Sequence, residues 1–405
     1  RYPVSFVNGK GSWLKSENGD DYLDFAAGIA VNILGHNHPK LNKAMIENVD
    51  KIWHLSNLYK IPEQEKLAEK LCSLSFAEKV FFCNSGAEAV EGAIKVARKY
   101  FYSKGETLRN EIITFSGSFH GRTLATLAAA GNPNYSEGFG PMPEGFISVP
   151  FADHDAFKRA INKNTAAVLL ETIQGEGGIR VLPDNCLKEI RKICTDNGIL
   201  LIIDEVQSGM YRTGTLNAYD WTSIEPDIVT IAKAIGGGFP LGAILTNEKA
   251  SQGMVNGTHG STFGGNPLAC TIGKKVLDTI EDEDIVGEPY ILSELEDDFT
   301  ALADDLKAAG DEETADKIID ALVASKEDDM DTAAKVDDMM NALQGKPDVN
   351  GAKQKELSSM TTLYTDAKYS DKNFKDFVSD TSSMVSKMGE LADAGSMDSD
   401  NYGPG

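Results

Sequence analysis

Two apolar runs that end in opposite charges constrain the fold of this chain more than any other feature. The first runs from Gly198 to Ile203 and is followed by Asp204 and Glu205. The second runs from Asp227 to Ala232 and is followed by Lys233 and three glycines. Both are short and rich in isoleucine, leucine and valine, which is typical of strands buried on both faces of a parallel sheet. The pattern therefore predicts an α/β fold.

The charged residues after these two runs point to a particular cofactor. A carboxylate that leaves one parallel strand and an amine that leaves another can meet at one edge of the sheet, where open α/β sheets bind ligands. A lysine there can form a Schiff base with pyridoxal phosphate (PLP), and an aspartate can keep the pyridine nitrogen protonated. We therefore predict that Lys233 and Asp204 are catalytic residues. The alternative is a surface lysine and an ion pair in the core.

A second signal for PLP lies further towards the N-terminus. A predicted strand over 79–83 leads through a turn into a predicted helix over 86–101, which has apolar residues on one face. The first turn of a helix has free N–H groups that bind anions such as a phosphate. Ser85, Gly86 and Ala87 are therefore the predicted phosphate site, with an ordinary serine cap as the alternative.

Other short apolar runs raise the number of strands expected in this part of the chain to seven. A helix is also expected over 64–71. The additional strands are predicted at Glu111–Phe115, Phe146–Phe151, Ala166–Glu171 and Gly242–Thr246.

Several motifs together resemble the class III (fold type I) PLP-dependent aminotransferases, and most of all the members that act on N-acetylornithine. The resemblance implies an α/β large domain with a mostly parallel seven-stranded sheet. It also implies that PLP is the cofactor, and that the δ-amino group of N-acetylornithine moves to 2-oxoglutarate in arginine biosynthesis. The motifs cover about residues 1 to 285 and read DEVQSGMYRTG, PDIVTIAKAIGGGFPLGA, SNLY, NSGAEA, FHGRT, GFGPMPEGF, QGEGG and STFGGNPLAC.

Four further side chains are expected around the cofactor ring. Asp204 and Val206 should point to the same side of their strand because side chains alternate, which places Val206 against the ring. Phe119 can cover one face of the ring. The resemblance also places His120 at the ring and Gln207 at its hydroxyl group.

Three other residues are expected to contact the substrate or the cofactor of a partner subunit. Arg122 can hold a carboxylate through two parallel hydrogen bonds, and the resemblance assigns it to the α-carboxylate of the amino donor; a structural salt bridge is the alternative. Glycines flank Glu176, and the resemblance implies that it moves aside when a dicarboxylate enters; a solvated loop acid is the alternative. The resemblance implies that Thr262 reaches the PLP phosphate of a neighbouring subunit, and hence a homodimer.

Charge and composition exclude several other classes of protein. The net charge is −23, of which residues 286–405 contribute −17, with 28 acidic residues against 11 lysines. Binding of nucleic acid is not expected, because no basic face is available to neutralise phosphates. No apolar run approaches the roughly 18 residues of a membrane span. Five cysteines without a CxxC pair favour reduced thiols, no bound metal and a cytoplasmic location.

We recognise no family in the region after about residue 285. We expect an N-terminal segment over 1–60, the PLP-binding domain over 61–285, an acidic helical region over 286–393 and a disordered tail over 394–405. The resemblance implies a second arginine for substrate carboxylates in this region, but no arginine follows Arg212. Helical spacing of apolar residues appears at 292–309, 316–324 and 332–343.

Two groups of alternatives remain. The amino donor could be ornithine, succinylornithine or 4-aminobutyrate, because class III motifs are shared among enzymes for these substrates. The chain could also bind PLP without catalysis and serve as an assembly protein whose acidic tail recruits partners.

Overall fold

The computed structural model describes residues 2–282 and eight helical positions beyond them, at 303, 307, 312, 313, 315–317 and 319. The chain divides into two compact units, 1–288 and 289–405. Apart from those eight positions, the expected helices of 286–393 and the expected disorder of 394–405 lie outside the described residues. All the named strands and helices belong to the first unit.

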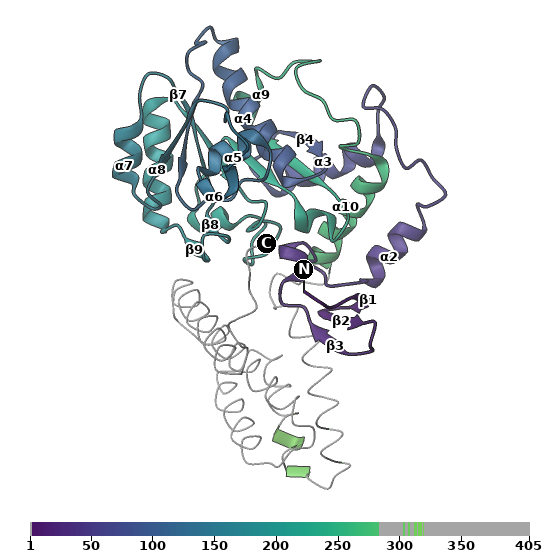
Figure 1. Ribbon diagram of the computed structural model, residues 1–405. Helices are drawn as coiled ribbons and strands as arrows, with labels where there is room; N and C mark the ends of the chain where they lie inside the picture. The colour runs from purple at the N-terminus through teal and green to yellow at the C-terminus, as the bar shows by residue number, and fades with distance from the viewer. Residues whose placement is uncertain are drawn as a thin grey trace. The chain divides into compact units, whose positions relative to one another are not determined.

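A seven-stranded sheet forms the centre of this unit, in the strand order β4-β12-β11-β10-β7-β5-β6 (Figure 1). β12 is antiparallel to both of its neighbours, and the other neighbouring strands are parallel. The prediction of a mostly parallel seven-stranded sheet is therefore confirmed. The strands are β4 (Lys79–Cys83), β5 (Glu111–Phe115), β6 (Phe146–Val149), β7 (Thr165–Leu170), β10 (Leu200–Asp204), β11 (Ile228–Ile231) and β12 (Gly242–Thr246).

Both faces of the sheet are covered, which explains why the central strands are continuous apolar runs. In β10, Leu200 and Ile202 pack in one cluster with helix α4 (Gly86–Ser103). Leu201 and Ile203 pack on the opposite face with helix α8 (Asp184–Asn197). All five residues of β10 are buried.

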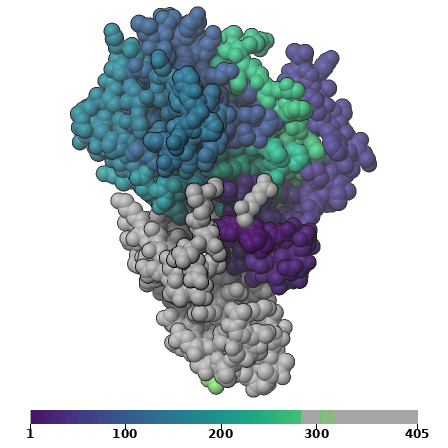
Figure 2. All heavy atoms as spheres, viewed as in Figure 1, coloured from purple at the N-terminus to yellow at the C-terminus, as the bar shows by residue number. Residues whose placement is uncertain are grey.

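Five further helices of the unit divide between these two clusters. Residues of α5 (Leu124–Ala130) and α9 (Glu248–Ser251) join the α4 cluster. Residues of α3 (Pro62–Leu74), α7 (His154–Ala160) and α10 (Pro267–Asp282) join the α8 cluster. Figure 2 shows the blue and teal segments of this fold lying together on one face.

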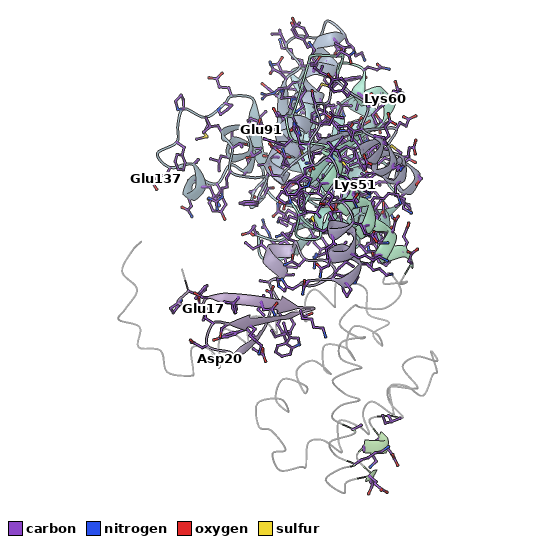
Figure 3. The ribbon with its side chains drawn as sticks, turned by 90° about the vertical axis from the view of Figure 1, so that its right-hand side faces the viewer. Glu17, Asp20, Lys51, Lys60, Glu91 and Glu137 are labelled. Atoms are coloured by element: carbon purple, nitrogen blue, oxygen red, sulfur yellow. The ribbon has the colours of Figure 1, made fainter. Side chains whose placement is uncertain are left out.

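The N-terminal segment forms a small antiparallel sheet of β1 (Phe6–Lys10), β2 (Trp13–Ser16) and β3 (Asp21–Leu23). Glu17 and Asp20 lie in the turn between β2 and β3 (Figure 3). The short helices α1 (Ala27–Ala30) and α2 (Pro39–Ile46) come next along the chain. A long loop then joins α2 to α3, and Lys51 and Lys60 lie in it (Figures 1 and 3).

Short elements near the edge of the sheet complete the fold. They are helix α6 (Pro133–Ser136), the hairpin of β8 (Ile173–Gln174) and β9 (Arg180–Val181), and the 3-10 helices η1 (Ala218–Thr222) and η2 (Lys233–Gly236). Over the described residues, no helix is long and apolar enough to cross a membrane. All five cysteines are free.

Candidate active site

Asp204 and Lys233 come together at the carboxyl ends of two neighbouring strands. β10 and β11 are parallel, and Asp204, the last residue of β10, pairs with Thr230 of β11. Lys233 follows β11 after one residue. Its backbone has φ 51°, in the left-handed region, which costs a non-glycine residue about 1–2 kcal/mol. Such strain is often found where a side chain is held for function.

The carboxylate of Asp204 is buried and held by three hydrogen bonds. Its side chain is 3 % exposed. The Oδ1 atom accepts bonds from the Thr230 hydroxyl at 3.0 Å and from the Val206 N–H at 3.1 Å. The Oδ2 atom lies 2.8 Å from Nδ1 of the fully buried His120. These contacts fix the direction of the charge, and the hydrogen bond to Asp204 raises the pKa of His120 against the opposing effect of burial.

A third buried acid, Glu171, belongs to the same cluster and was missed in the sequence. It directly follows β7, the neighbour of β10, and its Oε2 atom accepts the backbone N–H of Phe119 at 3.0 Å. Burial raises its pKa to about 8, and the charges of His120, Asp204 and Lys233 also act on it. An acid that follows a buried parallel strand is the same signal that identified Asp204, so Glu171 could have been found in that way.

The pKa of the Lys233 amine is lowered from its usual value. Burial lowers its pKa, and the positive charge of Arg212 acts in the same direction. The carboxylates of Asp204, Glu176 and Glu171 oppose this shift. A lowered pKa leaves more of the amine neutral and therefore nucleophilic.

The predicted phosphate site lies at the start of α4. Ser85 caps this helix, and its hydroxyl accepts the Glu88 N–H at 3.3 Å. The N–H groups of Gly86 and Ala87 are in the first turn and have no partner within the helix. A Cβ on Gly86 would lie 2.6 Å from Cγ1 of Val206, so Val206 lies directly against this cradle. Free N–H groups next to a lysine and a buried aspartate fit the phosphate, aldehyde and ring nitrogen of PLP.

The expected position of Val206 on the strand is wrong, because β10 ends at Asp204. Val206 lies in the turn after the strand, where its backbone N–H bonds to Asp204. Gln207 lies next in this turn, against Gly175, where its side chain leaves no room for a Cβ. The loop of the β8–β9 hairpin, which carries Glu176, therefore lies beside the turn that follows β10.

Arg122 lies between two aromatic rings. Its guanidinium carbon is 5.4 Å from the centre of the Phe119 ring and 4.1 Å from that of Tyr135. The two rings are themselves in edge contact, at 5.9 Å. Arg122 has an exposed side and can therefore still reach a ligand. Tyr135, on α6, was not singled out in the sequence, because nothing local links it to Arg122.

Thr262 lies on the surface of the single chain. Its neighbour Ser261 is close to the phosphate cradle, because the Asn84 amide donates to the Ser261 hydroxyl at 3.4 Å. The fold thus brings Asp204, His120, Lys233 and the start of α4 to one edge of the sheet and leaves Thr262 outside this buried cluster.

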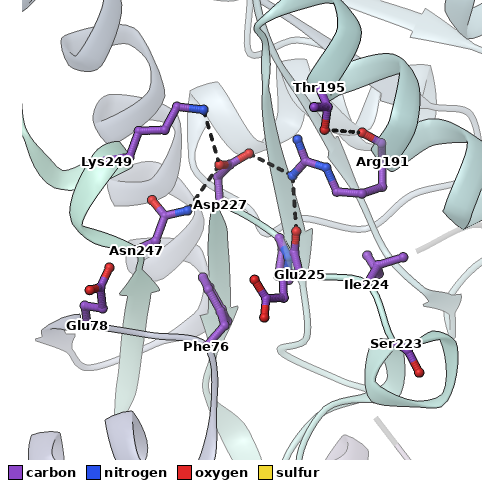
Figure 4. Close-up of a pocket in the computed structure, with 11 residues that line it drawn as sticks. Phe76, Glu78, Arg191, Thr195, Ser223, Ile224, Glu225, Asp227, Asn247 and Lys249 are labelled. Atoms are coloured by element: carbon purple, nitrogen blue, oxygen red, sulfur yellow. Dashed lines mark hydrogen bonds and ion pairs between the residues drawn. The ribbon is translucent and has the colours of Figure 1, made fainter.

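A hollow at the opposite edge of the sheet is a different kind of feature. It has a volume of about 790 Å³ and surrounds Asp227, at the amino end of β11 (Figure 4). Asp227 is held by Arg191 at 2.9 Å, by the Asn247 amide at 3.2 Å and by the backbone N–H of Leu201 at 2.9 Å. Asp227 forms ion pairs with both Arg191 and Lys249, so we interpret this hollow as a structural network.

Comparison with known proteins identifies the family. The model of the family "Aminotransferase class-III" matches residues 1–314. The expectation that the resemblance ends at about residue 285 is therefore wrong, because the match continues into the acidic region. The chain is 52 % identical over 318 residues to acetylornithine aminotransferase of Mesorhizobium japonicum, which covers 76 % of this chain and 80 % of that protein. It is 57 % identical over 280 residues to acetylornithine aminotransferase of Agrobacterium fabrum, covering 69 % and 70 %.

Solved structures agree with this result. Ornithine aminotransferase of Toxoplasma gondii matches with a TM-score of 0.69 and 31 % identity, over 75 % of this chain and 72 % of that one. N-acetylornithine aminotransferase of Stenotrophomonas maltophilia matches with a TM-score of 0.62 and 38 % identity, over 75 % and 76 %.

Proposed function

This chain belongs to the class III aminotransferases, which depend on PLP, and we propose that it moves the δ-amino group of N-acetylornithine to 2-oxoglutarate. The observation that carries the proposal is the meeting of Asp204 and Lys233 at the ends of β10 and β11, beside the free N–H groups of α4. The proposed substrate follows relatives at 52 % and 57 % identity, which are named acetylornithine aminotransferases.

Lys233 is the proposed general base and acid of the reaction. When bound, PLP supplies an aldehyde for the amino group and a ring that accepts electrons from the substrate carbon. The amine of Lys233 holds the cofactor in the resting enzyme and then carries the proton between substrate and cofactor carbons. The lowered pKa of Lys233 supports this role, because an amine with a pKa nearer to neutrality exchanges protons more readily.

The remaining residues hold the cofactor in position. Asp204 is proposed to pair with the pyridine nitrogen, since its buried charge is already oriented by His120 and Thr230. The start of α4 binds the phosphate, with Ser85 as its cap. The other proposed contacts of the ring are Phe119, His120, Val206 and Gln207.

Two residues are proposed to select the substrate. Arg122 binds the α-carboxylate of the amino donor, and its contacts with Phe119 and Tyr135 restrict where the guanidinium can lie. Glu176 is the exposed acid of the β8–β9 loop, and it lies close enough for its charge to act on Lys233. That position supports a part in admitting the second substrate.

The active unit is proposed to be a homodimer in the cytoplasm. Large apolar side chains are exposed in the loop between α2 and α3 and next to Thr262. A second copy of this chain would cover them and bring its Thr262 to the cofactor phosphate. The five free cysteines support a reducing compartment. The exposed residues are Ile52, Trp53, Leu58, Tyr59 and Phe263.

A screen of amino donors on the purified protein tests this function. N-acetylornithine should change the visible absorbance of the bound cofactor at lower concentration than ornithine, succinylornithine or 4-aminobutyrate. A faster response to one of the other donors would reassign the substrate, and no response to any donor would favour the non-catalytic assembly protein.

Lys233→Ala is the matched control for the screen. This protein should fold and bind PLP, but it should lose the absorbance band of cofactor joined to lysine and all turnover. Retention of both the band and the turnover would show that another residue holds the cofactor.

A further inference from the structure

The loop 259–265, here called the Thr262 loop, is held firmly although its tip is exposed. Thr262 and Phe263 are exposed, whereas Gly264 and Gly265 are buried. Phe263 is 60 % exposed although its ring centre lies 5.2 Å from that of His54. At its start, His259 stacks on Phe81 of β4 with 4.7 Å between ring centres. A loop that is pinned while its tip stays free is built to present that tip to something outside the chain.

Two amide side chains fix the backbone on either side of Thr262. The Asn57 Nδ2 atom donates to the carbonyl oxygens of Ser261, at 3.1 Å, and Gly264, at 2.9 Å. The Gln64 Nε2 atom donates to the carbonyl of Gly265 at 3.2 Å. It also donates to Oδ1 of Asn57 at 2.9 Å, so the two amides act as one unit.

The shape of the loop depends on these contacts and on its two glycines. Gly265 has φ 79°, and a Cβ there would collide with the Gln64 amide. Gly264 lies against the backbone of Phe82 and Cys83 in β4 and has no room for a Cβ. The loop is thus seated on the strand that leads into the phosphate cradle, and its tip cannot turn without breaking the bonds to Asn57 and Gln64.

We propose that Asn57 and Gln64 form a clamp that positions Thr262 for the cofactor phosphate of the partner subunit. The inference rests on the proposed homodimer and adds two positioning residues to it. The clamp fixes three carbonyl groups around Thr262 in advance, so that cofactor binding does not have to order the loop. Losing the clamp should therefore weaken PLP binding more than it lowers kcat.

A double-mutant cycle tests the clamp. We expect Asn57→Ala and Gln64→Ala each to raise the Kd for PLP by roughly 5- to 30-fold, as the loss of one or two hydrogen bonds implies. Thr262→Ala should also raise the Kd. The combination of Asn57→Ala with Thr262→Ala should bind PLP no more than about twofold more weakly than Thr262→Ala alone, because the clamp acts through Thr262.

Asn162→Ala is the matched control. Its amide also donates to two oxygen atoms, of Glu111 and Ala160, and it lies in the turn before β7. It should leave the Kd for PLP unchanged. Two outcomes would contradict the clamp but leave the contact between subunits standing. One is a double variant in which the increases in Kd for PLP are additive, and the other is an unchanged Kd in Asn57→Ala when the Kd of Thr262→Ala is raised. An unchanged Kd in Thr262→Ala would overturn the contact between subunits, and the clamp with it.

Mixed dimers test whether the clamp acts across the subunit interface. Asn57→Ala subunits are refolded with an excess of Lys233→Ala subunits, and turnover is titrated with PLP. In a mixed dimer, the intact Lys233 belongs to the Asn57→Ala subunit, and the intact clamp belongs to the other. The PLP requirement should return to that of the wild type. A requirement as high as that of the Asn57→Ala homodimer would mean that the clamp serves its own subunit, and the proposal would be wrong.

Discussion

At the scale of single residues, charge and hydrogen bonding separate the two acids at the ends of β7 and β10. Asp204 receives hydrogen bonds from Thr230 and the Val206 N–H and lies against His120. Glu171 has one described bond, from the Phe119 N–H, and a pKa raised by burial to about 8. We therefore expect Glu171 to be largely protonated near neutral pH.

Replacing Asp204 with asparagine should keep PLP bound and lower kcat by roughly 10²–10³-fold, the cost of removing one oriented electrostatic contact. The phosphate cradle on α4 remains, but the ring nitrogen loses its charged partner. Steady-state rates together with equilibrium dialysis of PLP measure the two effects. Asp227→Asn is the control, because Asp227 is also buried but lies at the other edge of the sheet. Near-normal turnover in Asp204→Asn would rule out the role in stabilising the ring charge.

Glu171 should make the stability of the protein fall as the pH rises. A carboxyl group whose pKa is raised in the folded state stabilises the fold while it is protonated. This contribution is complete below 4.5 and is lost as the pH rises towards about 8, at about 1.4 kcal/mol per unit of pKa shift. Glu171→Gln can still accept the Phe119 N–H and should show a smaller fall. Urea unfolding of both proteins over this pH range, at fixed PLP concentration, measures how the free energy of unfolding changes with pH. An equal fall in the two proteins would show that Glu171 is not the group responsible.

At the scale of elements, the start of α4 and the turn after β10 are fitted to each other through Gly86 and Val206. Gly86→Ala should place a methyl group 2.6 Å from Cγ1 of Val206. Such overpacking costs about 1–3 kcal/mol, so we expect PLP to bind roughly 5- to 150-fold more weakly. Adding Val206→Ala makes room and should restore part of the affinity. If the double variant bound no better than Gly86→Ala, steric contact between these elements would not be the cause.

The strands of the large sheet could be predicted from the sequence because each one is a short apolar run. All seven strands of the sheet were predicted, with ends that differ from the observed ones by up to two residues. The end of β10 was misjudged, because the period of two in an apolar run does not show where pairing stops. Asp204 and Lys233 stood out because each comes directly after such a run.

Contacts between distant segments could not be read in the same way. Tyr135 meets Arg122, and Asn57 meets the carbonyl groups of Ser261 and Gly264 about 200 positions later. Amides and a tyrosine in loops are common and carry no pattern of their own. Their roles depend on how the chain folds back on itself, which becomes visible only in three dimensions.

At the scale of the whole molecule, the distribution of arginines should affect the two half-reactions differently. No arginine follows Arg212, so the second carboxylate of 2-oxoglutarate lacks a bidentate partner from the tail. An unpaired charge in a closed site costs about 2–5 kcal/mol, which is roughly 30- to several-thousand-fold in affinity or rate. The half-reaction with N-acetylornithine should therefore survive better than that with 2-oxoglutarate. Single-turnover absorbance with each substrate measures this, and comparable rates would show that another residue replaces the arginine.

The strand order also decides when the cofactor site can form during synthesis of the chain. β4 leads into the phosphate cradle, and its partner in the sheet is β12, about 160 residues later. Ribosomes add roughly 5–20 residues per second, so β12 is made roughly 8–30 s after β4. Until then β4 has no neighbour to pair with, although α4 can already pack against β7, β10 and β11. The strand that leads into the phosphate cradle is therefore paired, and PLP stabilises the protein fully, only after β12 has left the ribosome.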